Sequence, residues 1–338
     1  MDSQGTTAVP QAGRMQQKKH PVLLIIFKRP ETTSRVVKAI QQYGPSALYV
    51  AADGPRRFHS EEAATRAARE VVDTAHWTCA VHKRYRPSNL GCQANVTDAL
   101  GWFFYHEPEG IVLEDDVVPS PQFFAFCGEG LKAFRDSRHV VGIGGYTASQ
   151  PGSPYLSVHG SVWGWASWQN QWQSTFDVEA KVSTRDLEAM LSVASVFSVL
   201  EKLSIKARLA RQVVDTWDYP WLFSRMQSRK FMLLPGGPLV ANVGFGSDAT
   251  HTKRRPLPPM TVSPCSSWTE LSNVSFESST IRKLDRHRIV SRLGSYKTIW
   301  LALKALVQTP ASSVALLMLA IGGRRRVASF VSEWGIKK

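Results

Sequence analysis

Three consecutive carboxylates follow an apolar run in the first half of the chain. Residues 111–119 read IVLEDDVVP, so Glu114, Asp115 and Asp116 come after a strand-like segment and before a proline. Carboxylate oxygens are ligands that Mg²⁺ and Mn²⁺ prefer, and these cations hold substrate phosphates. Because side chains alternate along a strand, we expect Glu114 and Asp116 on one face and Asp115 on the other. The run indicates a metal site for a phosphate-bearing ligand; a solvated acidic turn is the alternative.

Polar side chains also follow two other strand-like runs. Lys28 and Arg29 come after residues 22–27, and Asp53 comes after residues 47–52. A guanidinium suits a phosphate, and an aspartate suits the N–H edge of a base or a ribose hydroxyl. Taken singly, Arg29 is explained as a surface charge and Asp53 as a turn residue before Gly54. Their coincidence with the acidic triplet favours one shared ligand crevice.

Downstream, tryptophans and one aspartate form two aromatic segments. Trp163, Trp165 and Trp168 lie in WGWASW, where the indoles either pack in the core or contact an acceptor sugar. Asp218 lies in TWDYPW, and an aspartate among rings can have a raised pKa and act as a general base toward a hydroxyl. The alternative for Asp218 is a helix N-cap. His251, further on, could bind metal or pyrophosphate, although a lone histidine is more often structural.

The elements that must position these residues alternate along the chain. Apolar runs predict strands at 22–27, 47–52, 78–82, 110–113 and 140–143, and amphipathic runs predict helices at 31–43, 61–75, 92–105 and 121–134. Such alternation indicates an α/β fold with a mainly parallel sheet flanked by helices and a ligand beyond the carboxyl ends of the strands. The sequence has neither a GxGxxG fingerprint nor a Walker loop, which argues against a dinucleotide dehydrogenase and a P-loop NTPase.

Charge is distributed unevenly over the 338 residues. The whole chain carries +14, and residues 253–338 hold 15 Lys and Arg against 4 acids, a net of +11. This basic region contains amphipathic and apolar runs too short and interrupted to span a bilayer. It is expected to form a helical extension that either attaches to an anionic membrane surface or packs on the domain.

The N-terminus shows no signal-peptide pattern, and the four cysteines show no metal-ligand spacing. We therefore expect a cytoplasmic protein, peripheral to the inner face of the membrane if the basic region attaches there, with reduced structural thiols. The expected organisation is a flexible segment at 1–19, a catalytic domain at 20–252 and the basic region at 253–338.

Six segments in order resemble a GT-A glycosyltransferase: PVLLIIFKRP, LYVAADGP, GIVLEDDVVPSPQFFAF, WGWASW, TWDYPW and NVGFGSDATHT. The chain is similar to the N-acetylglucosaminyltransferase I type and to bacterial hemolytic-protein-like nucleotide-diphospho-sugar transferases. The resemblance covers roughly residues 20 to 252. It implies a Rossmann-like GT-A fold and transfer of a sugar, with a UDP-sugar favoured as donor, to a saccharide or lipid-linked acceptor, as in polysaccharide biosynthesis.

The resemblance also implies a role for individual residues. Arg29 would contact the nucleotide diphosphate and Asp53 the uracil, while Glu114 and Asp115 would position the sugar nucleotide. Asp116 would ligate Mn²⁺ or Mg²⁺. Asp218 would deprotonate the acceptor hydroxyl in a single displacement with inversion.

Two other functions stay open. A nucleotidyltransferase acting on a sugar phosphate also uses carboxylate-held Mg²⁺ on a parallel sheet, but it requires a Gly-rich basic loop after the first strand, and FKRPETT is not one. A non-catalytic basic protein that binds lipid or nucleic acid is the third possibility. Nucleic acid is not an expected partner of the leading candidate.

Overall fold

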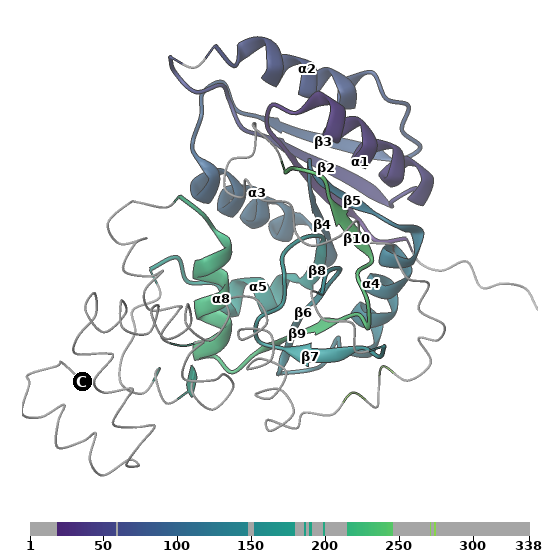
Figure 1. Ribbon diagram of the computed structural model, residues 1–338, viewed down its shortest axis with the longest axis vertical. Helices are drawn as coiled ribbons and strands as arrows, with labels where there is room; N and C mark the ends of the chain where they lie inside the picture. Colours follow the sequence, from purple (N-terminus) through teal and green to yellow (C-terminus); the bar gives the residue numbers. More distant parts are fainter. Residues whose placement is uncertain are drawn as a thin grey trace, which may run out of the picture.

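The computed structural model describes residues 19–58, 60–147, 152–179, 186, 189–190, 199, 215–245, 271 and 274. Within these residues the chain forms a mixed α/β fold in which helices flank both faces of a large, mostly parallel sheet (Figure 1). The strands are β1 (Val22–Ile26), β2 (Ala47–Ala52), β3 (Ala80–Tyr85), β4 (Glu109–Glu114), β5 (Val117–Pro119), β6 (Val140–Gly144), β7 (Tyr155–Ser157), β8 (Trp165–Trp168), β9 (Phe231–Leu234) and β10 (Val240–Asn242). The helices are α1 (Pro30–Tyr43), α2 (Glu62–Asp73), α3 (Cys92–His106), α4 (Pro121–Ala133), α5 (Gln169–Thr175) and α8 (Asp218–Gln227).

The main sheet has the order β3-β2-β1-β4-β8-β6-β9-β7 among the described strands. Strands β1 to β4 are mutually parallel, as the alternation of strands and helices predicts. Strand β8 is antiparallel to both of its neighbours, and β7 runs antiparallel to β9. The half of the sheet that ends in the candidate site is thus wholly parallel, and the second half is mixed.

Burial follows from the composition of the central strands. Every residue of β1 is buried, because helices cover both faces of the sheet there. Strand β1 sends Leu24 to the cluster that includes residues of α1, α2 and α4, and Leu23 to the cluster that includes α3 and α5. Figure 1 shows α3, α5 and α8 on one side of the sheet and α1 and α4 on the other.

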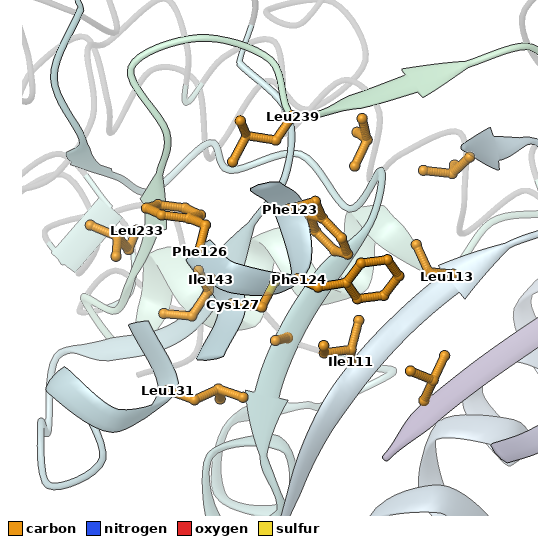
Figure 2. Packing of buried hydrophobic residues seen from close by; sticks show 14 of the residues in the cluster. Ile111, Leu113, Phe123, Phe124, Phe126, Cys127, Leu131, Ile143, Leu233 and Leu239 are labelled. Carbon is orange, nitrogen blue, oxygen red and sulfur yellow. The ribbon is translucent and has the colours of Figure 1, made fainter. Parts of the chain in front are cut away.

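Helix α4 packs its aromatic face on the centre of the sheet. Figure 2 shows Phe123, Phe124 and Cys127 of this helix with Ile111 and Leu113 of β4. The helix starts where predicted, since Pro121 occupies its first turn and the Ser120 side chain accepts the N–H of Phe123. This packing fixes β4, whose carboxyl end carries the acidic triplet.

The predicted elements are confirmed with small shifts at their ends, and several shorter elements were not anticipated. The third strand begins at Ala80 rather than at residue 78. The segment WGWASW contributes the antiparallel strand β8, in which all four residues are buried. Strands β5 and β10 pair with each other outside the main sheet.

Several sequence-based predictions lie outside the described residues. These are the flexible N-terminal segment apart from Lys19, His251 with the preceding SDAT, and nearly all of the basic region at 253–338, including Cys265. Cys79, Cys92 and Cys127 are free thiols. No helix in the described part of the chain has the length and apolarity needed to cross a membrane.

Candidate functional site

The ends of β1 and β4 meet through a cluster of charges. Strand β4 lies beside β1 with Glu114 opposite Ile25, so both strands end at the same edge. Arg29 Nη1 lies 2.7 Å from Asp116 Oδ2 and 3.5 Å from Asp115 Oδ1. The N–H of Phe27 donates to Asp115 Oδ2 at 2.9 Å. The predicted convergence of these two strand ends is therefore present.

The predicted alternation does not extend through the triplet. Strand β4 ends at Glu114, and Asp115 and Asp116 form a turn before β5. Because the backbone turns there, the period of two no longer separates the side chains, and Arg29 reaches both aspartates. The expectation that Asp115 points to the opposite face from Asp116 is wrong for this reason.

Burial and neighbouring negative charges raise the pKa values of two carboxylates in the triplet. Burial first, and then the charge of Asp116, raises the pKa of Asp115 to about 7, although Arg29 and the Phe27 N–H oppose the rise. Burial also holds the pKa of Glu114 well above its usual value, with further contributions from Asp116, Asp115 and Asp218. The site therefore concentrates more negative charge than its own guanidinium neutralises.

Asp218 reaches the same cluster from a distant part of the chain. It lies in the first turn of α8, and its charge contributes to the raised pKa of Glu114. Trp217 is the N-cap position, so the N-cap interpretation of Asp218 is wrong. Its Oδ1 accepts a short hydrogen bond from Thr216 Oγ1. The candidate base and the acidic triplet thus lie at one edge of the sheet.

Helix α8 also carries a buried arginine. Arg225 is 1% exposed, and its Nη2 donates to the carbonyl of Gly160 at 3.2 Å. Burial lowers the pKa of Arg225 to about 9, and the charge of Asp218 opposes this shift. Arg225 is therefore a buried basic residue whose charge interacts with that of Asp218.

Strand β10 brings a glycine against the triplet. Asn242 pairs with Val117, and the N–H of Val243 donates to the backbone carbonyl of Asp116 at 2.8 Å. A Cβ at Gly244 would lie 1.9 Å from Asp116 Oδ2, so only glycine allows this approach. The start of the segment NVGFGSDATHT therefore borders the carboxylate predicted to hold the metal.

Asp53 lies at the end of β2, as predicted, and its carboxylate is fully engaged within the chain. It accepts hydrogen bonds from the N–H groups of Gly54, Leu90 and Gly91 and from Asn89 Nδ2, at 2.8 to 3.2 Å. Burial raises its pKa, while the backbone donors and Arg86 oppose that rise. Asp53 holds the loop before α3, and its contact with a base stays a prediction.

The loops after β1 and β2 are held together by a buried acid. Glu61 accepts from Lys28 Nζ at 2.6 Å and from Arg56 Nη2 at 2.7 Å. Burial alone would raise the pKa of Glu61, but these hydrogen bonds lower it to about 2. Lys28 is thus committed to Glu61, which leaves Arg29 as the basic residue of this turn that contacts the triplet.

The tryptophans divide between core and site. Trp165 and Trp168 are 0% and 3% exposed, and Trp165 stacks on Trp217 with ring centroids 5.8 Å apart. Core packing, the first of the two interpretations, describes both. Trp163 is partly exposed and contacts Tyr146 and Phe245, with centroids 4.6 and 5.9 Å away. Among the three, Trp163 is the one that is not fully buried.

The donor set suits a hard divalent cation. Among the described residues, no three or more His, Cys, Asp or Glu side chains form a ready-made metal site. Asp116, however, is only partly buried, and its charge is the second cause, after burial, of the raised pKa values of Glu114 and Asp115. A cation bound to Asp116 would relieve this repulsion. The residues therefore fit Mn²⁺ or Mg²⁺.

Comparisons with known proteins add little to this geometry. No protein-family model matches the sequence, and no curated protein matches it significantly. Among solved structures, the chain is similar to HddC from Yersinia pseudotuberculosis, with 9% sequence identity and a TM-score of 0.29, over 45% of this chain and 77% of that chain. A similarity of this size carries no argument about fold or activity.

Sequence reasoning missed three contributors to the site: Gly244, Arg225 and Glu61. Each acts through a contact with a distant segment, so no local pattern marks it. The nearest signal was the position of Gly244 inside NVGFGSDATHT, one of the segments that carry the resemblance. Glu61 was assigned only to a helix, and Arg225 was not considered.

Proposed function

We propose that the chain is a metal-dependent glycosyltransferase of the GT-A type, which moves a sugar from a nucleotide diphosphate donor to a hydroxyl of a saccharide or lipid-linked acceptor. The observation that carries the proposal is the meeting of Arg29, the acidic triplet and Asp218 at one edge of the sheet. This edge is where α/β proteins with parallel strands bind ligands.

The donor side is built from β1, β4 and β10. Arg29 is placed to exchange its contact with Asp116 for the diphosphate, because a guanidinium forms paired hydrogen bonds with phosphate oxygens. Glu114 and Asp115 position the sugar nucleotide. Asp116 would hold Mn²⁺ or Mg²⁺, and the cation would supply positive charge that stabilises the departing diphosphate. Gly244 closes the site over Asp116 without a side chain.

The acceptor side is built from α8 and the aromatic residues. Asp218 removes the proton of the acceptor hydroxyl, the hydroxyl oxygen forms a bond to the anomeric carbon, and the nucleotide diphosphate leaves with the electron pair. The configuration at the anomeric carbon inverts in this single displacement. Trp163 offers a ring face to the acceptor beside Gly244 and Phe245.

A screen of nucleotide diphosphate sugars by thermal shift, with and without Mn²⁺, tests the function. A true donor should raise the melting temperature more with Mn²⁺ than without it, because a ligand at 100 times its Kd stabilises the folded state by about 2.7 kcal/mol. Calorimetry with each hit then gives the affinity.

Other outcomes would contradict the proposal. If only a nucleoside triphosphate together with a sugar phosphate stabilised the chain, the function would be nucleotidyl transfer. If no nucleotide acted, and salt-sensitive binding to DNA or to anionic vesicles were the sole response, a non-catalytic binding role would replace it.

A further inference from the structure

The N-terminus of α3 is capped by a residue from the far side of the sequence. Asp215 Oδ2 accepts the N–H of Cys92 at 2.7 Å, and Asp215 Oδ1 accepts the N–H of Gln93 at 2.9 Å. The local N-cap residue, Gly91, has no side chain to do this. A carboxylate is well suited to the position because the first N–H groups of a helix lack internal partners and carry partial positive charge.

Glycine at position 91 is what makes room for this contact. Gly91 has a φ of +89°, a region that other residues rarely adopt, and a Cβ there would lie 2.7 Å from Asp215 Oδ2. The same turn is also held from the donor side, since Asp53 accepts the N–H groups of Leu90 and Gly91. Two carboxylates therefore hold the start of α3: Asp53, which follows β2, and Asp215, which precedes α8.

The capping residue stands three positions before the candidate base. Between them, Trp217 is 2% exposed and stacks on Trp165, and its backbone N–H donates to the thiol of Cys92. Burial first, and then the charges of Glu114, Asp215 and Asp218, raise the pKa of the Cys92 thiol. The start of α3 thus contacts the segment of the base through Asp215, and the charge of Glu114 at the end of β4 acts on Cys92.

We infer that Asp215 is a positioning residue: its double hydrogen bond to α3 holds the start of α8 so that Asp218 faces the carboxyl end of β4. Asp215 supplies the two hydrogen bonds that join the segment 215–218 to α3, and Trp217 adds the packing of its ring on Trp165. Asp215 itself touches neither reacting group, and its catalytic effect rests on the proposed function.

The inference predicts a specific kinetic pattern. Asp215→Ala should lower kcat for transfer on the order of 10- to 100-fold, because a small displacement of a catalytic group has effects of that size. The KM and calorimetric affinity for the donor should stay within about twofold, because the donor-side residues are untouched. Asp215→Asn should recover part of the loss, since its amide oxygen still accepts one N–H.

A second variant disrupts the same contact by a change at the start of α3. Gly91→Ala should reproduce the loss of kcat, and the double variant with Asp215→Ala should be no worse than the more severe single variant, because both remove one interaction. Gly101→Ala is the matched control: it lies in the same helix, and its Cβ would meet nothing within 4 Å. Ser120→Ala, which removes the cap of α4, controls for general loss of stability.

Hydrogen exchange of the unliganded chain separates the inference from the proposed function. The amides of Asp218, Tyr219 and Trp221 should exchange faster in Asp215→Ala and Gly91→Ala, but not in Ser120→Ala. Unchanged exchange there, or a loss of thermal stability with unaltered kcat, would make Asp215 a simple helix cap and overturn the inference. Equal losses of kcat and donor affinity would do the same. A wild-type chain that binds no nucleotide sugar would overturn the proposed function, while the exchange result would still decide the tether.

Discussion

Arg29 Nη1 donates to Asp116 Oδ2 at 2.7 Å although 87 positions separate the two residues. The contact arises because β1 and β4 are neighbouring parallel strands that end at the same edge of the sheet. The contact joins the guanidinium of Arg29, which suits a phosphate, to the carboxylate of Asp116, which suits a metal.

Asp116→Ala should abolish the metal-dependent part of donor hydrolysis and transfer. We expect a loss of more than about 100-fold, since even residues that only support a metal ligand are worth 10- to 100-fold. Turnover at a range of Mn²⁺ concentrations, with circular dichroism to check the fold, measures this. Glu70→Ala on the exposed face of α2 is the control, and wild-type turnover by Asp116→Ala would remove the metal assignment.

Asp218→Asn should bind donor normally and lose transfer. The expected reduction in kcat is about 10²- to 10⁴-fold, the usual contribution of a general base. The amide keeps an acceptor for Thr216 Oγ1 but cannot take the proton of the acceptor hydroxyl. Calorimetry and initial rates separate the two effects, with Asp136→Asn as an exposed control. Retained transfer would exclude Asp218 as the base.

Gly244→Ala should disturb the site through its contact with Asp116. The new Cβ would lie 1.9 Å from Asp116 Oδ2, so either the carboxylate or the strand-end segment must move. We expect weaker Mn²⁺-dependent stabilisation and an at least tenfold lower transfer rate, in keeping with the sensitivity of catalysis to small displacements. Gly101→Ala, on an exposed helical surface, should instead stabilise the chain by about 0.5–1 kcal/mol. Equal effects of the two variants would contradict the close approach.

The stability of the unliganded chain should fall as pH rises from about 4 to about 7. The folded pKa of Asp115 is about 7 against an unfolded value of 3.8, so within this window the folded state holds a proton that the unfolded state has lost. Each pH unit then removes up to about 1.4 kcal/mol of unfolding free energy. Asp115→Asn should flatten this part of the profile, as measured by urea unfolding between pH 4 and 8. Parallel profiles would refute the assignment.

The two halves of the sheet differ in how far the sequence predicts their strands. Strands β1 to β4 and their helices followed from the periods of apolar residues, and Arg29, Asp53 and the triplet were found at strand ends because local patterns mark where strands stop. Strand β8 was missed, since four buried residues rich in tryptophan show no alternation.

The residues alone determined that the chain is an α/β protein and that one strand end is rich in carboxylate, because both depend on short-range pattern and residue type. Only the tertiary structure decided what those carboxylates meet: Arg29 pairs with two of them, Gly244 packs on one, and the charge of Asp218 in α8 acts on Glu114. It also decided that Asp215 caps α3. These contacts join positions that are tens to more than a hundred residues apart, and they depend on the order and direction of strands and on packing, which no local pattern encodes.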